Sequence, residues 1–145
     1  MRLINKKAKR DYEVKDTIEA GIVLTGGEVK SLRMGQGNLL GSRVTIRDGE
    51  VWIVGLSIPR YKYADSNDDY DSDKVRKLLI KRKEKQCLET KARSEGLTTV
   101  PLSVYNRRGL IKVEIGLVRG KKKFEKREVL KKRTEKRDLS RRFKR

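Results

Sequence analysis

The sequence predicts a mainly β fold: a small antiparallel OB-like barrel with flanking helices and a basic C-terminal tail. Residues 42–58 carry a hairpin pattern, and over residues 111–117 the apolar residues Ile111, Val113, Ile115 and Leu117 alternate strictly with Lys112, Glu114 and Gly116. Proline is scarce, with 2 in the whole chain, and helical patterns are few and short. Several short strands with two helices favour a small barrel with the helices packed outside it.

The first half of the chain holds an arm, a strand and a helix. Residues 1–10 are basic and polar, and we expect a loosely held arm. Residues 13–24 end in a compact apolar run and predict a strand. Residues 28–34 are good helix formers, and Gly35 would end that helix.

The middle of the chain predicts a hairpin, a strand and a longer helix. Asp48-Gly49 is a turn signal within residues 42–58, so this segment should fold back on itself. Residues 75–80 predict a strand. Residues 82–94 predict a helix that ends at Gly96.

The last two predicted strands form a second hairpin. Residues 98–105 should be an edge strand, because Pro101 lacks a backbone N–H for pairing. Residues 110–117 return beside them after the link formed by residues 106–109.

The basic tail is the most unusual part of the composition. Residues 119–145 hold 15 Lys and Arg against 4 Asp and Glu, which gives +11 of the total net charge of +19. Apolar residues are too sparse there to offset the loss of chain entropy, so we expect a tail that is disordered when free. We expect two parts, an RNA-binding barrel over residues 1–118 and a tail that orders against a polyanion such as RNA.

The composition argues against several classes of protein. The chain has no histidine and one cysteine, Cys87, so it lacks the commonest general base and an ordinary zinc ligand set. We therefore expect no catalytic residue, no metal site and no cofactor. No apolar run approaches the roughly 20 residues of a membrane span, and the N-terminal segment lacks the apolar core of a secretory signal. We expect a cytoplasmic protein that does not bind membranes.

Two weaker motifs suggest other functions. Residues 26–31 contain glycines and a Lys-Ser pair but lack the spacing of a phosphate-binding loop. Residues 64–73 carry five aspartates, which favour an exposed acidic loop. A nuclease that holds Mg²⁺ through Asp65, Asp68 and Asp69 stays open as an alternative, although the spacing of a calcium-binding loop is absent.

Four segments together form a specific pattern. They are NKKAKRDY at 5–12, EAGIVLTGGEVKSLR at 19–33, RKLLIKRKE at 76–84 and KVEIGLVRGKKKFEKRE at 112–128. By their order and spacing, the chain resembles the small protein B (SmpB) family, bacterial proteins that bind transfer-messenger RNA (tmRNA). The resemblance covers nearly the whole chain.

The resemblance implies a fold, a function and partners. It implies an OB-like barrel that binds the tRNA-like domain of tmRNA and replaces the missing anticodon arm in the decoding centre of the small ribosomal subunit. It also implies a tail that lies as a helix in the empty mRNA channel. The outcome would be trans-translation, the rescue of stalled ribosomes, with elongation factor Tu reached through alanyl-tmRNA.

The resemblance also assigns roles to single positions. Those it associates with tmRNA binding are Asn5, Glu19, Leu79, Lys112, Gly120, Lys121 and Lys122. Those it associates with the decoding centre and the mRNA channel are Arg10, Phe124, Glu125, Lys126, Arg127, Lys131, Lys132, Arg133 and Arg137.

Two positions depart from the family pattern, in which His is frequent at position 10 and Tyr or His at position 124. The guanidinium of Arg10 can stack on a base as an imidazole does, without the pH sensitivity of histidine. The ring of Phe124 can stack but brings no hydroxyl group.

Simpler interpretations of these residues stay open at this point. Glu19 could be the surface partner of a lysine, Leu79 could be a core residue and Lys112 could be a solvated strand residue. As a whole, the chain could be a general basic OB-fold RNA binder or a ribosomal protein that binds many RNAs with steep salt dependence.

Overall fold

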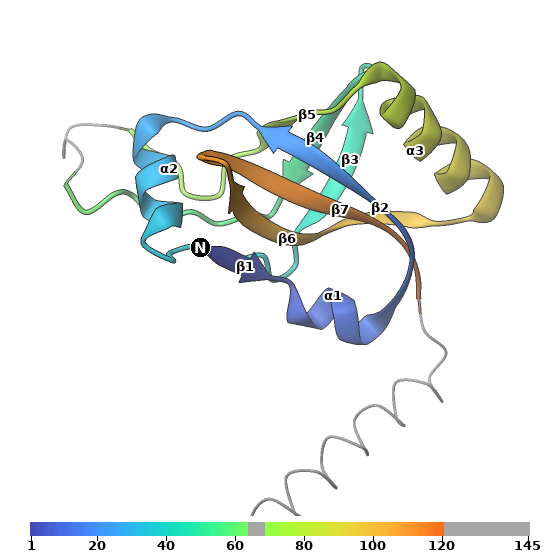
Figure 1. Ribbon diagram of the computed structural model, residues 1–145, viewed down its shortest axis with the longest axis horizontal. Coiled ribbons are helices and arrows are strands. Elements are labelled where there is room, and N and C mark those ends of the chain that lie inside the picture. Colours follow the sequence, from blue (N-terminus) through green and yellow to red (C-terminus); the bar gives the residue numbers. More distant parts are fainter. Residues whose placement is uncertain (64–68, 121–145) are drawn as a thin grey trace, which may run out of the picture.

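The computed structural model describes residues 1–63 and 69–120, which form one curved sheet with three helices around it (Figure 1). The tail residues 121–145 and the segment 64–68 lie outside the described residues. The elements are β1 (Arg2–Ile4), α1 (Lys6–Asp11), β2 (Tyr12–Ile22), α2 (Gly26–Arg33), β3 (Arg43–Arg47), β4 (Glu50–Val54), β5 (Arg76–Leu79), α3 (Arg82–Glu95), β6 (Thr98–Arg107) and β7 (Leu110–Gly120).

The sheet is antiparallel and has seven strands in the order β1-β6-β7-β2-β5-β4-β3. The mainly β prediction is therefore confirmed. The predicted closed barrel is corrected, because within the described residues the ladder ends at β1 on one side and at β3 on the other. The sheet still curls strongly, and β3 approaches β6, where the Thr99 hydroxyl donates to the Val44 carbonyl at 2.8 Å. This side-chain hydrogen bond links β3 to β6, where backbone pairing would be needed to close a barrel.

The best-predicted elements are those with explicit end signals. Asp48 and Gly49 have φ angles of 54° and 75° and form the turn between β3 and β4. Helix α3 ends at Gly96, which has φ 64° and donates its N–H to the Ala92 carbonyl. Positive φ angles favour glycine, so the sequence marked these ends clearly.

The N-terminal arm was predicted wrongly, and the edge-strand prediction is corrected for part of β6. Residues 2–4 form β1, which pairs with Ser103–Tyr105, so this part of β6 lies inside the sheet, whereas, in the described part of the chain, residues 98–101 pair with β7 alone. The sheet tolerates Pro101 because the pairing of β6 with β7 shifts register between Pro101 and Ser103. Residues 6–11 form α1, whose Ala8 is buried.

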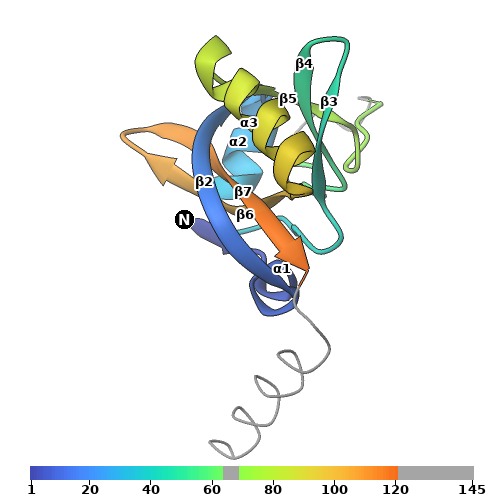
Figure 2. The ribbon, with the colours of Figure 1, turned by 90° about the vertical axis from the view of Figure 1, so that its right-hand side faces the viewer.

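The core lies on the concave side of the sheet, under α2 and α3. Each helix contributes a fully buried leucine, Leu32 from α2 and Leu88 from α3. The two helices cover different ends of the curl, and α3 lies beside the β3–β4 hairpin (Figure 2). Among residues 1–63 and 69–120, no helix is long and apolar enough to cross a membrane.

Candidate nucleic-acid interface

One row of residues crosses five strands on the outer face of the sheet. Arg2 pairs with Tyr105, Tyr105 with Lys112, Lys112 with Gly21, and Gly21 with Leu79. Residues directly opposite one another project from the same face of a sheet. The next row, with Val104 and Val113, is buried and faces the core, so the first row faces outward. We call this set the outer row.

A shallow hollow of about 410 Å³ lies over one end of the outer row. Its lining includes three of the residues that the family resemblance singled out, Glu19, Leu79 and Lys112. Gly21 lies between Lys112 and Leu79 in the row and adds no side chain, and a Cβ placed there would approach Leu79 Cβ to 3.5 Å. Because Gly21 has no side chain, nothing projects from this position into the hollow.

Leu79 is exposed, which argues against the interpretation of this residue as core. The side chain is 54% accessible at the end of β5, whereas the preceding Leu78 is buried. An apolar side chain on a face that also carries Lys112 can pack against the flat face of a nucleobase while the ammonium group neutralises a phosphate.

Glu19 is held by two donors from another strand. The Tyr105 hydroxyl donates to Glu19 Oε2, and Arg107 Nη1 lies 2.9 Å from Oε2 and 3.1 Å from Oε1. Tyr105 and Arg107 belong to β6 and Glu19 to β2, so both side chains reach over β7. Of the interpretations left open, that of a surface partner comes closest for Glu19, although its partners are a tyrosine and an arginine rather than a lysine.

These contacts shift the pKa values of Glu19 and Tyr105. The hydrogen bonds from Tyr105 and Arg107 hold the pKa of Glu19 below its ordinary value. Desolvation and the hydrogen bond to Glu19 raise the pKa of Tyr105 to about 12. At neutral pH the carboxylate is therefore charged, and the phenol keeps the proton that it donates.

Asn5 lies apart from this hollow and is buried. Its side-chain oxygen accepts from the Ala8 N–H at 3.1 Å and caps α1, and its amide nitrogen donates to the Pro101 carbonyl at 2.9 Å. The side chain thus ties α1 to β6 and is not presented on the surface.

Arg10 lies on α1, and Gly120 is the last residue of β7. Arg10 is half-buried on α1 and forms an ion pair with Asp11 at 3.1 Å. Gly120 pairs with Tyr12, which directly follows α1, so the start of the tail and α1 are neighbours (Figure 1). The remaining predicted tail residues, Lys121, Lys122, Phe124, Glu125, Lys126, Arg127, Lys131, Lys132, Arg133 and Arg137, lie outside the described residues.

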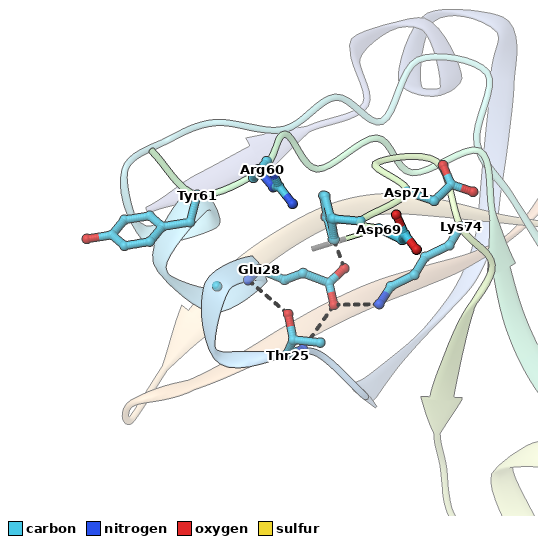
Figure 3. Close-up of a pocket in the computed structure, with 9 residues that line it drawn as sticks. Thr25, Glu28, Arg60, Tyr61, Asp69, Asp71 and Lys74 are labelled. Carbon is cyan, nitrogen blue, oxygen red and sulfur yellow. Dashed lines mark hydrogen bonds and ion pairs between the residues drawn. The ribbon is translucent and has the colours of Figure 1, made fainter. Parts of the chain in front are cut away.

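A second pocket, between α2 and the segment that precedes β5, is acidic as well as basic (Figure 3). The carboxylate of Glu28 points inward there and is contacted by Lys74 at 3.3 Å, while Asp69 and Asp71 lie on the rim. Of the aspartates of the alternative nuclease, Asp65 and Asp68 lie outside the described residues. Within residues 1–63 and 69–120, no three His, Cys, Asp or Glu side chains gather in a way that could hold a metal ion.

Arg2, Tyr105 and Arg107 belong to this surface but were not among the residues predicted from the sequence. The alternation along residues 98–105 could have placed Tyr105 on the polar face of its strand. Arg107 was read as part of the link rather than as strand, and Arg2 as part of a loose arm. Cross-strand register, which a single sequence does not give, brings these residues to Glu19 and Lys112.

Comparisons with known proteins agree with this picture. The family model described as SmpB protein matches residues 3–145. An SsrA-binding protein of a Sulfurihydrogenibium species is 49% identical over 140 residues, which covers 97% of this chain and 91% of that protein. The SsrA-binding protein of Acidothermus cellulolyticus is 47% identical over 137 residues, covering 94% and 86%.

A solved structure gives the same result at the level of the fold. It is described as "tmRNA-SmpB: a journey to the center of the bacterial ribosome", and it matches with a TM-score of 0.68 and 44% identity. The match covers 84% of this chain and 85% of that one. From the family match and these identities over most of its length, the chain belongs to the SmpB family.

Proposed function

We propose that this protein binds the tRNA-like domain of tmRNA through the hollow over its outer row and delivers it to stalled ribosomes for trans-translation. One observation carries the proposal: Glu19, Leu79 and Lys112, far apart in the sequence, line one hollow. The relatives named SsrA-binding protein support the same RNA as ligand. The SmpB family is one of RNA-binding proteins rather than enzymes, in agreement with the expectation from the composition.

The three residues offer complementary contacts to RNA. Lys112 would neutralise a backbone phosphate, which fixes position without reading sequence. Leu79 would pack against an unstacked base. The charged Glu19 would accept a hydrogen bond from a base amino group, which a phosphate cannot give. This combination suits a folded, partly single-stranded RNA surface.

The other end of the molecule would contact the small ribosomal subunit. Arg10 would stack on or bind rRNA in the decoding centre, and the tail would follow the empty mRNA channel through Glu125 to Arg127 and the basic residues up to Arg145. The pairing of Tyr12 with Gly120 supports this, because it holds the root of the tail beside α1. The protein would thereby replace the missing anticodon arm and meet elongation factor Tu through alanyl-tmRNA in the cytoplasm.

Asn5 would support binding indirectly. Both of its polar groups are already hydrogen bonded inside the protein, so we propose that it fixes α1 against β6. Gly120, Lys121 and Lys122 would then extend the basic surface from the body into the tail.

The test is equilibrium binding to the isolated tRNA-like domain and to an ordinary tRNA across a salt titration. We expect a preference for the tRNA-like domain that persists at physiological salt. Leu79→Ala should weaken binding to the tRNA-like domain about fivefold, whereas Leu110→Ala, at an exposed leucine outside the hollow, should leave it unchanged.

Lys112→Gln should weaken binding and lower the salt slope by about one. Lys83→Gln, at an exposed lysine of α3 outside the hollow, is the matched control. Equal affinities for both RNAs that fall together with salt would instead support a general RNA binder. The net charge of +19 makes that the second candidate function.

A further inference from the structure

We propose that Tyr105 and Arg107 are positioning residues that leave Glu19 one acceptor position, so that this carboxylate reads a single N–H donor of an RNA base. The inference rests on the proposed function and adds two residues to the site. The side chains of Tyr105 and Arg107, both on β6, extend across β7 and bind the Glu19 carboxylate on β2.

The hydrogen bonds to Glu19 can be counted. An ionised carboxylate has about four lone-pair positions, two on each oxygen. Oε2 accepts from the Tyr105 hydroxyl and from Arg107 Nη1, which fills both of its positions. Oε1 accepts from the same Arg107 nitrogen at 3.1 Å. Among residues 1–63 and 69–120, one position on Oε1 is left for a ligand.

The surroundings explain why the carboxylate needs to be held. Glu19 lies directly opposite Glu114 of β7, and like charges in a cross-strand pair repel each other. The side chain of Glu19 is also 34% exposed, so without donors it could turn into solvent. Tyr105 and Arg107 supply the attraction that outweighs this repulsion and keeps Glu19 at the hollow.

Tyr105 is itself fixed on both sides. The Arg2 guanidinium lies over its ring, 5.4 Å from the centroid, and Lys112 is its cross-strand neighbour. The phenol therefore has a defined direction, toward Glu19. Because its pKa is raised to about 12, it donates at any physiological pH. The hydroxyl is therefore a fixed donor to Glu19.

The ligand that fits is a base amino group. A donor with one hydrogen available for Oε1 suffices, and a second carboxylate or a phosphate oxygen would be repelled. Lys112 and Leu79, in the same hollow, would take the neighbouring phosphate and the face of a base. Glu19 then supplies the base-edge contact of the site, and its orientation decides how well a wrong base is rejected.

The experiment is a double-mutant cycle on the full-length protein with the tRNA-like domain of tmRNA as the probe. Tyr105→Phe keeps the ring and removes only the hydroxyl, and it changes no charge. Arg107→Gln removes one donor and one charge. Its matched control is Arg108→Gln, which removes the same charge from the exposed neighbouring position in the turn. Each change is measured alone and together with Glu19→Ala.

We expect Tyr105→Phe to weaken binding about fivefold with an unchanged salt slope, and Arg107→Gln about tenfold. Arg108→Gln should cost less than about twofold. In the Glu19→Ala protein, Tyr105→Phe should have no further effect. The pKa of Glu19, followed by NMR, should rise in both variants, a change that a purely structural role elsewhere in the sheet would not produce.

Three outcomes would overturn the inference. The first is a Tyr105→Phe loss of the same size with and without Glu19, which would show that the hydroxyl acts independently. The second is wild-type affinity in both Tyr105→Phe and Arg107→Gln, with the preference for the tRNA-like domain unchanged. This result would refute the inference but leave the proposed function intact. The third is a wild-type protein that shows no preference between the two RNAs, which removes both.

Discussion

Glu28 of α2 and Arg76 of β5 form an ion pair in which each side chain is about 1% exposed. Arg76 also donates to the carbonyls of Leu56, Lys74 and Ser72, so one guanidinium joins α2, β5 and the segment between β4 and β5. The Thr25 N–H, Lys74 and the Tyr70 hydroxyl also contact the Glu28 carboxylate (Figure 3). The pair lies on the buried face of β5, opposite the face that carries Leu79.

Glu28→Gln should strongly destabilise the fold. It would leave Arg76 buried without its counter-charge, which costs about 3 kcal/mol of unfolding free energy. Urea unfolding followed by circular dichroism measures the change. The control is Glu50→Gln, whose exposed pair with Lys77 at 3.4 Å should be worth less than about 1 kcal/mol. An equal loss of unfolding free energy in Glu28→Gln and Glu50→Gln would contradict the larger contribution of the buried pair.

The stability of the protein should fall in acid, in part through Glu28. Burial disfavours the carboxylate, but the Thr25 N–H, Arg76 and Lys74 together hold its pKa below the ordinary value of 4.5. A lowered folded-state pKa gives stability above pH 4.5 that is lost as the pH falls through the folded-state pKa. The urea midpoint between pH 7 and pH 3 should therefore drop more steeply for the wild type than for Glu28→Gln. Parallel curves would exclude this contribution.

Asn5→Ala should act on stability before it acts on RNA. It removes the cap of α1 and the bond to Pro101, which together cost about 2 kcal/mol. The melting temperature should fall by several degrees, and binding of the tRNA-like domain should recover at low temperature, where α1 is formed. Asn106→Ala, at an exposed position of β6, is the control. A loss of affinity at unchanged melting temperature would instead indicate direct RNA contact.

Removal of residues 121–145 should separate binding from rescue. The cut belongs after Gly120, because β7 pairs with Tyr12 up to that residue, two positions beyond the predicted boundary at 118. The shortened protein should keep its preference for the tRNA-like domain with a smaller salt slope, since it loses basic residues. Tagging of peptides on stalled ribosomes, measured in a reconstituted translation system, should disappear. Tagging by the shortened protein would contradict the role of the tail.

The sequence predicted those elements whose ends are set by local chemistry. The Asp48-Gly49 turn and the Gly96 end of α3 depend on backbone angles that few residues adopt, so the residue types reveal them. Closure of the barrel and the place of β1 depend on pairing between distant strands, for which a single sequence carries no signal. Leu79 shows the same limit, because its place on the outer face follows from its register opposite Gly21 of β2.

Strand β7 has a mechanical consequence. It carries Lys112 near one end and Gly120 at the other, about 26 Å away for an extended strand. It is also paired on both sides, with β2 and with β6. A force applied to the chain beyond Gly120 acts along the axis of β7. The hydrogen bonds of β7 to β2 and to β6 would then resist the force together, in shear, instead of breaking one after another. Under the proposed function, a pull of the ribosome on the tail would therefore be transmitted as a rigid displacement to Lys112, the proposed phosphate contact.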